Sequence, residues 1–138
     1  MSREIEERLH SFFAKDAHGA VAVYLYGSLS RGTATSESDI DLGVLFAETP
    51  PKTFQALPLR LEEKLEQETG RAVQVVTLNH ASPDLCHRVF RDGKLILDSN
   101  PSARIQFEVK TRNDYFDLLP ILQRYRRYPT MTKVKAIQ

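Results

Sequence analysis

The sequence is short of cysteine, of long apolar runs and of net charge, and each shortage excludes a class of protein. One cysteine among 138 residues, Cys86, excludes an internal disulfide framework and a zinc site made of cysteines alone, and it favours a reducing compartment. The longest apolar stretches have only the length of a strand, so we expect neither a signal peptide nor a membrane span. A net charge of +1 matches neither a disordered acidic tail nor a general nucleic-acid binder. We therefore expect a soluble, cytoplasmic protein without a membrane partner.

The hydrophobic content of 41% is enough for one folded core, and its spacing predicts both helices and strands. Three helices are expected in the first hundred residues: Arg3–Lys15, Leu57–Thr69, and a short helix from its N-cap Ser82 to its stop Gly93. The predicted strands are Ala20–Tyr26, Ile40–Phe46, Ala72–Leu78 and Lys94–Leu97. A long helix over about 101–128, which Pro120 should kink or break, precedes a basic tail over 129–138. Because no linker interrupts this order, we expect a single domain over residues 1–138.

The most informative motif is a Gly-Ser pair followed, ten residues later, by two aspartates. Gly27 ends a predicted strand and permits a tight turn, and Ser28 offers a hydroxyl beside exposed backbone N–H groups, which suits a phosphate. Asp39 and Asp41 leave the same face of the next strand, with Cα atoms roughly 6.5 to 7 Å apart. Such carboxylates can converge on Mg²⁺, or on two ions about 3.5 to 4 Å apart, that would neutralise a triphosphate and hold its α-phosphorus for attack.

Either half of this motif is common by itself, because Gly-Ser is usually a turn and Asp-x-Asp is often a solvated strand edge. Both halves lie at strand boundaries here, in an order that favours a metal–nucleotide site. No Walker-type Gly-Lys-Ser/Thr loop is present, so phosphate binding would depend on the serine loop and the metal. Arg31, between the two halves, is placed to contact a phosphate or a partner, and a solvated turn residue explains it equally.

The motif resembles the signature of the polymerase-β-type nucleotidyltransferase superfamily, carried here by Tyr26-Gly27-Ser28-Leu29-Ser30-Arg31-Gly32 and by Ser38-Asp39-Ile40-Asp41-Leu42. The small size of the chain, and weaker similarity that continues to residues 110–117, indicate the minimal nucleotidyltransferase branch. The resemblance thus covers nearly the whole chain. It implies an α/β (α+β) nucleotidyltransferase fold, which is a mixed β-sheet flanked by helices, with a long C-terminal helix.

The resemblance also implies a function and its residues. Members of this branch usually serve as antitoxins to a HEPN-domain RNase toxin, and the better understood pairs transfer AMP to a tyrosine hydroxyl of the toxin. By this resemblance Gly27 and Ser28 bind the nucleotide, with Arg31 as a further candidate, whereas Asp39 and Asp41 are catalytic and ligate the metal. The expected substrate is ATP, the expected cofactor is Mg²⁺, and the expected assembly is a hetero-oligomer with a HEPN-domain toxin.

One position departs from the superfamily pattern. A third carboxylate normally stands on a later strand, where it helps position the metal and can receive a proton, but Gln74 occupies the expected place here. A neutral amide is no base near neutral pH and adds no charge to attract a second Mg²⁺. One interpretation is an active adenylyltransferase whose acceptor is activated by solvent or by the partner. The other is a nucleotide-binding or steric antitoxin without transfer activity. We favour the first, because Asp39 and Asp41 are intact.

A third alternative is an antibiotic-modifying nucleotidyltransferase. Such enzymes typically carry an additional substrate-binding domain, for which this chain has little room. The adjacent Cys86 and His87 suggest a thiolate–imidazole dyad, but neighbouring helical residues point about 100° apart. We therefore expect a buried thiol beside a surface imidazole.

The C-terminal segment is basic, with eight Lys and Arg against three Asp and Glu over residues 104–138. Arginines interleave there with Tyr125 and Tyr128, a composition that suits a protein interface. The same composition would suit RNA or DNA. A solvated helix face with a frayed tail explains it equally.

Overall fold

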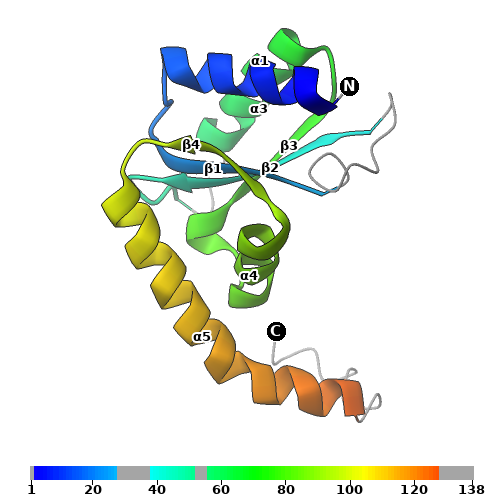
Figure 1. The fold of residues 1–138 in the computed structure, drawn as a ribbon, viewed down its shortest axis with the longest axis vertical. Helices are drawn as coiled ribbons and strands as arrows, with labels where there is room; N and C mark the ends of the chain where they lie inside the picture. The colour runs from blue at the N-terminus through cyan, green and yellow to red at the C-terminus, as the bar shows by residue number, and fades with distance from the viewer. Residues whose placement is uncertain (1, 28–37, 52–55, 128–138) are drawn as a thin grey trace.

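The computed structural model describes residues 2–27, 38–51 and 56–127, which form one mixed sheet with helices on both faces (Figure 1). The described helical segments are α1 (Ser2–Lys15), α3 (Ala56–Thr69), the 3₁₀ turn η1 (Leu78–His80), α4 (Pro83–Asp92) and α5 (Pro101–Arg127). The strands are β1 (Ala20–Tyr26), β2 (Ile40–Phe46), β3 (Val73–Thr77) and β4 (Lys94–Asp98). The predicted fold class, a mixed sheet flanked by helices with a long C-terminal helix, is confirmed.

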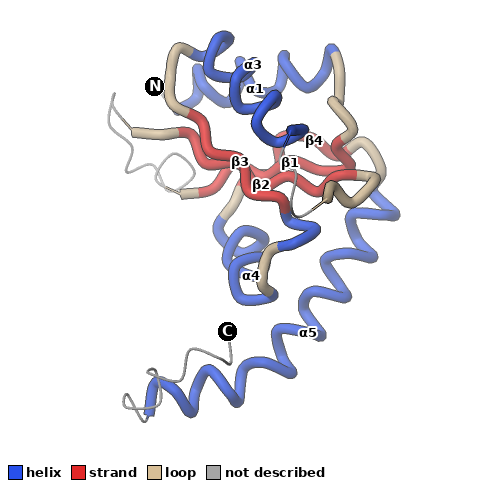
Figure 2. The backbone as a smooth tube through the Cα atoms, turned by 180° about the vertical axis from the view of Figure 1, so that it is seen from behind, coloured by secondary structure: helices blue, strands red, loops and turns tan. Residues whose placement is uncertain are grey.

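The four strands lie in the order β3-β2-β1-β4 (Figure 2). β1 pairs antiparallel with β2 and β4, whereas β2 and β3 are parallel and are joined through α3. The end of β1 therefore meets the starts of β2 and β3 at the same end of the sheet. In this register Tyr26 is the partner of Asp41, and Asp41 is in turn the partner of Gln74.

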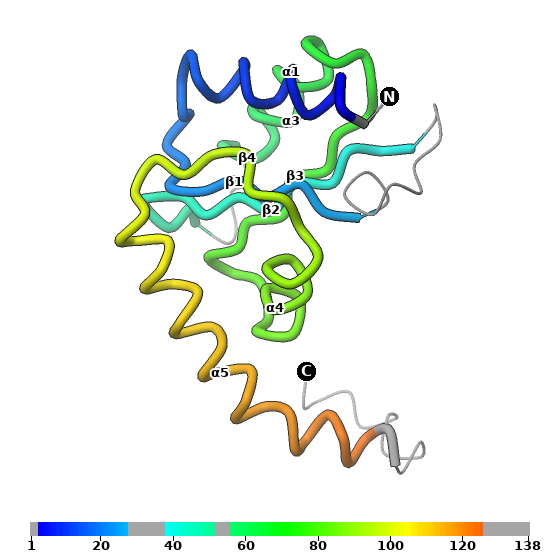
Figure 3. The backbone as a smooth tube through the Cα atoms, viewed as in Figure 1, coloured from blue at the N-terminus to red at the C-terminus, as the bar shows by residue number. Residues whose placement is uncertain are grey.

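One face of the sheet is covered by α1 and α3, which lie beside each other above it in Figure 3. Their apolar side chains pack on every second residue of the strands. The buried residues of this layer include Leu9, Phe13, Leu61, Leu65, Val23, Leu25, Ile40, Leu42 and Val44. The same alternation directs Tyr24, Tyr26 and Asp41 to the opposite face.

The opposite face carries α4 and the first part of α5 (Figure 2). Val89 and Cys86 of α4 are buried there with Tyr24 of β1, and Phe90 and Phe107 pack at the margin of this cluster. The C-terminal part of α5 extends away from the sheet (Figure 1). Within the described part of the chain, no helix combines the length and the apolarity that crossing a membrane would require.

Several elements differ from their predicted bounds by one residue at an end. β3 ends at Thr77, and the predicted last residue of that strand, Leu78, begins η1 instead. Pro120 was predicted to kink or break α5; the helix runs through Pro120 without a break, and its axis changes direction in its C-terminal half (Figure 1). Pro120 is exposed, so water can bond the carbonyl that its missing N–H leaves free. The predicted tail over 129–138 lies outside the described residues.

A polar network connects α5 to the sheet. The buried Tyr24 hydroxyl donates a 2.6 Å hydrogen bond to the Glu108 carboxylate, which also accepts one from Arg104 at 3.1 Å. Arg104 is in addition 3.0 Å from the carboxylate of Asp98 at the end of β4. Burial, and then the hydrogen bond to Glu108, raise the pKa of Tyr24 far above its usual value. Its hydroxyl therefore stays protonated and donates this bond throughout the neutral range.

Tyr24→Phe should lower the free energy of unfolding by about 1.5–3 kcal/mol, because it removes a hydrogen bond to a charged acceptor. Urea denaturation followed by circular dichroism measures this change. Tyr115→Phe is the matched control, since the Tyr115 ring stacks on His87 and the ring is retained. A loss no larger for Tyr24→Phe than for Tyr115→Phe would contradict a stabilising role for the network.

Candidate functional site

The predicted site residues of the described chain gather at the end of the sheet where β1 stops and β2 and β3 start. Gly27 directly follows β1, and Asp39 directly precedes β2. Asp41 and Gln74 are the second residues of β2 and β3. The sheet thus brings together four residues that span almost fifty positions of the sequence.

Gly27 lies so close to Asp41 that another residue type would be strained at this position. Its backbone has a φ of +78°, a conformation that L side chains rarely adopt. A Cβ atom built on Gly27 would lie 2.5 Å from Oδ2 of Asp41, well inside van der Waals contact. The glycine is therefore required both by the turn after β1 and by the approach of the Asp41 carboxylate.

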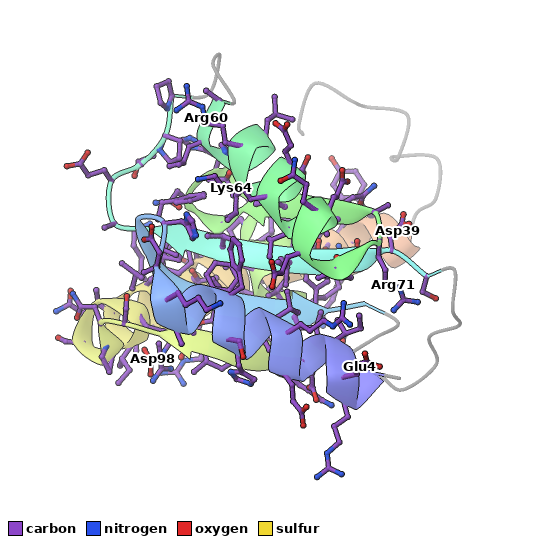
Figure 4. All side chains as sticks on the ribbon, turned by 90° about the horizontal axis from the view of Figure 1, so that it is seen from above. Glu4, Asp39, Arg60, Lys64, Arg71 and Asp98 are labelled. Atoms are coloured by element: carbon purple, nitrogen blue, oxygen red, sulfur yellow. The ribbon has the colours of Figure 1, made fainter. Side chains whose placement is uncertain are left out.

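Asp39 and Asp41 flank Ile40, whose side chain is buried on the opposite face of the sheet. The Ile40 N–H donates a 2.9 Å hydrogen bond to the Ala72 carbonyl, which holds the start of β2 beside the start of β3. Asp39 is exposed, whereas Asp41 is partly buried. Figure 4 places Asp39 and Arg71 at the same end of the sheet, and Arg71 is a cation that the motif did not predict there.

Ser28 and Arg31, the remaining predicted nucleotide-binding residues, lie in the segment 28–37, outside the described residues. Their roles stay predictions. Gly27 nevertheless fixes the point from which that segment departs, and this point is next to the Asp41 carboxylate.

Gln74 faces Asp41 across the parallel pair of β2 and β3. Register partners in a sheet project from the same face, so the Gln74 amide and the Asp41 carboxylate lie on one side. The strand is held from its outer edge by α3, because Glu66 accepts a hydrogen bond from the Val73 N–H at 3.1 Å and Glu62 accepts one from the Val75 N–H at 2.8 Å. These two bonds flank Gln74 and support its position opposite Asp41.

Tyr26 borders Asp41, and Arg88 lies within electrostatic range of Tyr26, although neither was predicted as a site residue. Tyr26 is the partner of Asp41 on β1, and burial followed by the negative charge of Asp41 raises the pKa of the Tyr26 hydroxyl. The positive charge of Arg88 on α4 lowers the same pKa, so this arginine is within electrostatic range of the phenol. Arg88 also lies 3.8 Å from the Asp84 carboxylate. No local sequence signal marks Arg88, because its approach depends on how α4 packs against the sheet.

The oxygen donors at this end of the sheet fit Mg²⁺. Asp39 and Asp41 offer carboxylate oxygens, and Gln74 offers an amide oxygen on the same face as Asp41. Mg²⁺ prefers oxygen and is commonly bound through one or two carboxylates together with the phosphates of a substrate. A nucleotide would thus supply the remaining oxygen ligands.

Cys86 and His87 do not form a nucleophile with its base. Cys86 is buried, and burial raises the pKa of its thiol to about 11, so the reactive thiolate is disfavoured near neutral pH. His87 instead stacks on Tyr115, with ring centroids 3.9 Å apart and planes only 6° apart. The predicted buried thiol is confirmed, whereas the imidazole that was expected at the surface is half-buried against Tyr115.

Comparison with known proteins adds independent findings. The family model described as polymerase beta, nucleotidyltransferase, matches residues 7–102. The chain is 36% identical over 93 residues to protein adenylyltransferase MntA of Shewanella oneidensis, an alignment that covers 67% of this chain and 64% of that protein. This chain therefore spans slightly less than two thirds of the length of that relative.

Two solved structures are similar over most of the chain. A chain in the crystal structure of a toxin–antitoxin with AMP-PNP has a TM-score of 0.73 and 30% identity, and the match covers 88% of this chain and 95% of that one. A chain in the complex of the tri-AMPylated Shewanella oneidensis HEPN toxin with its MNT antitoxin has a TM-score of 0.69 and 27% identity, with 92% and 97% covered.

The range matched by the family model includes all of the predicted site residues, from Gly27 to Gln74, and it ends where α5 begins. The resemblance inferred from Gly27-Ser28 and from Asp39-Ile40-Asp41 is confirmed by this match and by the similarity to solved nucleotidyltransferase-fold chains of toxin–antitoxin complexes. The chain belongs to the polymerase β nucleotidyltransferase family.

Proposed function

We propose that this chain is a protein adenylyltransferase that acts in the cytoplasm as the antitoxin of a HEPN-domain toxin. It neutralises the toxin by Mg²⁺-dependent transfer of AMP from ATP to a tyrosine hydroxyl. The observation that carries the proposal is the contact between Gly27 and Asp41, which sets a carboxylate against the start of the predicted phosphate loop. The relatives support it, since one is named a protein adenylyltransferase and others are chains of toxin–antitoxin complexes.

In the proposed reaction the tyrosine oxygen attacks the α-phosphorus of ATP, and the bond between that phosphorus and the β-phosphate oxygen breaks. Pyrophosphate leaves, and AMP remains on the tyrosine. A bound Mg²⁺ would offset the negative charge of the phosphates. Asp39 and Asp41 would hold the metal, while Gly27 and Ser28 would direct N–H and hydroxyl donors at phosphate oxygens. Arg88 would add a cation on the α4 side of the site.

Gln74 cannot act as the base that accepts the proton of the tyrosine hydroxyl. A phenol has a pKa near 10 and keeps its proton at neutral pH, and an amide does not accept it. In the proposed reaction the proton therefore passes to water or to a group of the toxin. A site of this kind should work more slowly than one with a third carboxylate.

The proposal is tested by incubating the purified chain with the HEPN-domain protein encoded in the same genome, ATP and Mg²⁺. We expect mass spectrometry to detect AMP on a tyrosine of the HEPN-domain protein, and no AMP after chelation of Mg²⁺. A stable complex without any adduct would contradict transfer. It would support the second candidate, a nucleotide-binding or steric antitoxin, which the neutral amide of Gln74 opposite Asp41 favours.

Gln74→Asp should raise the rate of AMP transfer by about tenfold or more, because it places a carboxylate beside Asp41 that can receive the proton and attract a second Mg²⁺. The rate is measured as AMP incorporated into the HEPN-domain protein over time. Gln67→Asp on the exposed side of α3 is the matched control and should leave the rate unchanged. Equal rates for the two variants would contradict the role assigned to position 74.

A further inference from the structure

Helix α5 carries a row of apolar side chains that the described part of the chain leaves exposed. Ile105, Val109 and Phe116 have 49%, 40% and 56% of their surfaces exposed, and we call these three residues the α5 stripe. Their spacing of four and seven residues aligns them along one side of the helix. A single exposed apolar residue is ordinary, but an aligned row is typical of an interaction surface.

A hollow of about 400 Å³ lies beside the α5 stripe, between α4 and α5. Phe90 of α4 contributes to its lining together with Ile105 and Val109 of the stripe. Arg91, Arg112 and Glu108 line the same hollow, and Arg91 is also 2.9 Å from the carboxylate of Asp92. Apolar residues accompanied by arginines are the usual composition of a pocket that anchors a side chain of a partner protein.

The charged residues around the α5 stripe have both signs, since Glu108 lines the hollow and the exposed Asp117 is next to Phe116. Lys110 is paired with Asp114 at 3.1 Å, and Arg104 is paired with Asp98 and Glu108. Arg112 and Arg124, by contrast, are exposed, and none of the ion pairs within residues 2–27, 38–51 and 56–127 involves them. A protein with carboxylates next to apolar side chains is complementary to this surface. A nucleic acid would match Arg112 and Arg124 but would cover the apolar row poorly.

The hollow and the candidate site lie on the same face of the sheet, separated by α4. Arg88 of α4 is within electrostatic range of Tyr26, the partner of Asp41, while His87 and Arg91 of the same helix line the hollow. A protein seated between α4 and α5 would therefore lie on the side of the sheet that carries the Asp41 carboxylate.

Helix α5 also lies beyond the core that defines the family. The family model stops at residue 102, the second residue of α5. The match to the toxin–antitoxin chain with AMP-PNP covers 88% of this chain, which is more than residues 1–102 amount to. That match must extend into the C-terminal segment, so an addition to the catalytic core is shared with a chain known from such a complex.

We propose that the α5 stripe and the adjoining hollow dock the protein that receives AMP. The docked element is an amphipathic helix of that protein, with carboxylates beside its apolar residues. The apolar side chains cover Ile105, Val109 and Phe116, and the carboxylates meet Arg112. The identity of the partner as a HEPN-domain toxin rests on the proposed function.

The docking is tested with Val109→Glu in the full chain, by calorimetric titration with the HEPN-domain protein of the same genome. Val109→Glu should weaken binding by about tenfold or more, because it places a charge in the centre of the stripe. Leu59→Glu is the matched control: Leu59 is 59% exposed on α3, which covers the other face, and its variant should bind within about twofold of the wild type. Arg112→Glu should weaken binding and reduce its dependence on salt.

The outcomes separate the docking from the proposed transfer. Unchanged affinity of Val109→Glu, or equal loss in Leu59→Glu, overturns the docking. If the wild-type chain binds the toxin but transfers no AMP to it, and Val109→Glu abolishes that binding, the docking is supported and the transfer is overturned. Absence of any wild-type complex overturns both. If Arg112→Glu binds the toxin as tightly as the wild type does but loses the binding of single-stranded RNA that the wild type shows, Arg112 contacts nucleic acid and not the toxin.

Circular dichroism and thermal melting establish that each variant is folded. If Val109→Glu fails this check, a photoreactive benzoylphenylalanine at position 105 replaces it. Crosslinking from position 105 to the HEPN-domain protein, with none from position 59, supports the docking. Equal crosslinking from both positions, or none from position 105, overturns it.

Discussion

Asp41→Asn should lower the rate of AMP transfer by at least about a hundredfold. The change removes the charge of a proposed metal ligand, and a metal contributes several kcal/mol of charge stabilisation in the transition state. Asparagine has nearly the shape of aspartate, so the packing against Gly27 is retained and the fold should be preserved. The rate is measured as AMP incorporated into the HEPN-domain protein at saturating ATP and Mg²⁺.

The control for Asp41→Asn is Glu63→Gln, which makes the same change from carboxylate to amide at an exposed position on α3. It should transfer AMP at the wild-type rate. Asp41→Asn should still bind the HEPN-domain protein, because the α5 stripe is a separate surface. A rate for Asp41→Asn within about threefold of wild type would contradict the assignment of Asp41 as a metal ligand.

Gly27→Ala should both destabilise the protein and stop AMP transfer. A φ of +78° costs an L side chain about 1–2 kcal/mol, and the added methyl group would also meet Oδ2 of Asp41 at 2.5 Å. Either the carboxylate or the end of β1 must then move. We expect a decrease of at least about 2 kcal/mol in the free energy of unfolding, measured in urea.

Gly70→Ala provides a matched control for the backbone part of this effect. Gly70 has a φ of +69°, but a Cβ atom built there has no neighbour within 4 Å. Gly70→Ala should therefore lose about 1–2 kcal/mol and keep its AMP transfer, because it carries the strain without the clash. The difference between the variants isolates the contact with Asp41. Equal stability and equal transfer in both would show that this contact is unimportant.

The predicted helices and strands agree well with the observed ones because their signals are local. The bounds of β1 and β2 coincide with the predicted strands, since compact apolar runs end at Gly27 and before Pro50. The predicted N-cap of α4 is also observed, with the Ser82 hydroxyl accepting a 3.2 Å hydrogen bond from the Leu85 N–H. Whether Pro120 kinks or breaks α5 was left open, because its cost depends on solvent exposure, which the sequence does not state.

The composition of the candidate site was largely predictable, but its arrangement was not. The sequence pointed to Gly27, Asp39, Asp41 and Gln74 through a motif and a resemblance. It held no sign of Arg88 or Arg71, because nothing in the neighbourhood of either residue along the chain indicates a site. The exposed side of α5 was likewise invisible, since Ile105, Val109 and Phe116 look like the core residues of any amphipathic helix.

Residue types at short spacing were enough to predict the elements and the motif of Gly27-Ser28 and Asp39-Ile40-Asp41, and the family resemblance predicted a third carboxylate missing at Gln74. Strand register, which the sequence did not state, places the Asp41 carboxylate next to Gly27 and places Gln74 opposite Asp41. Helix packing likewise leaves an apolar row of α5 exposed beside a hollow between α4 and α5. Strand register and helix packing bring together residues that are far apart in the chain. They are stabilised by contacts throughout the core, so no short stretch of the sequence predicts them.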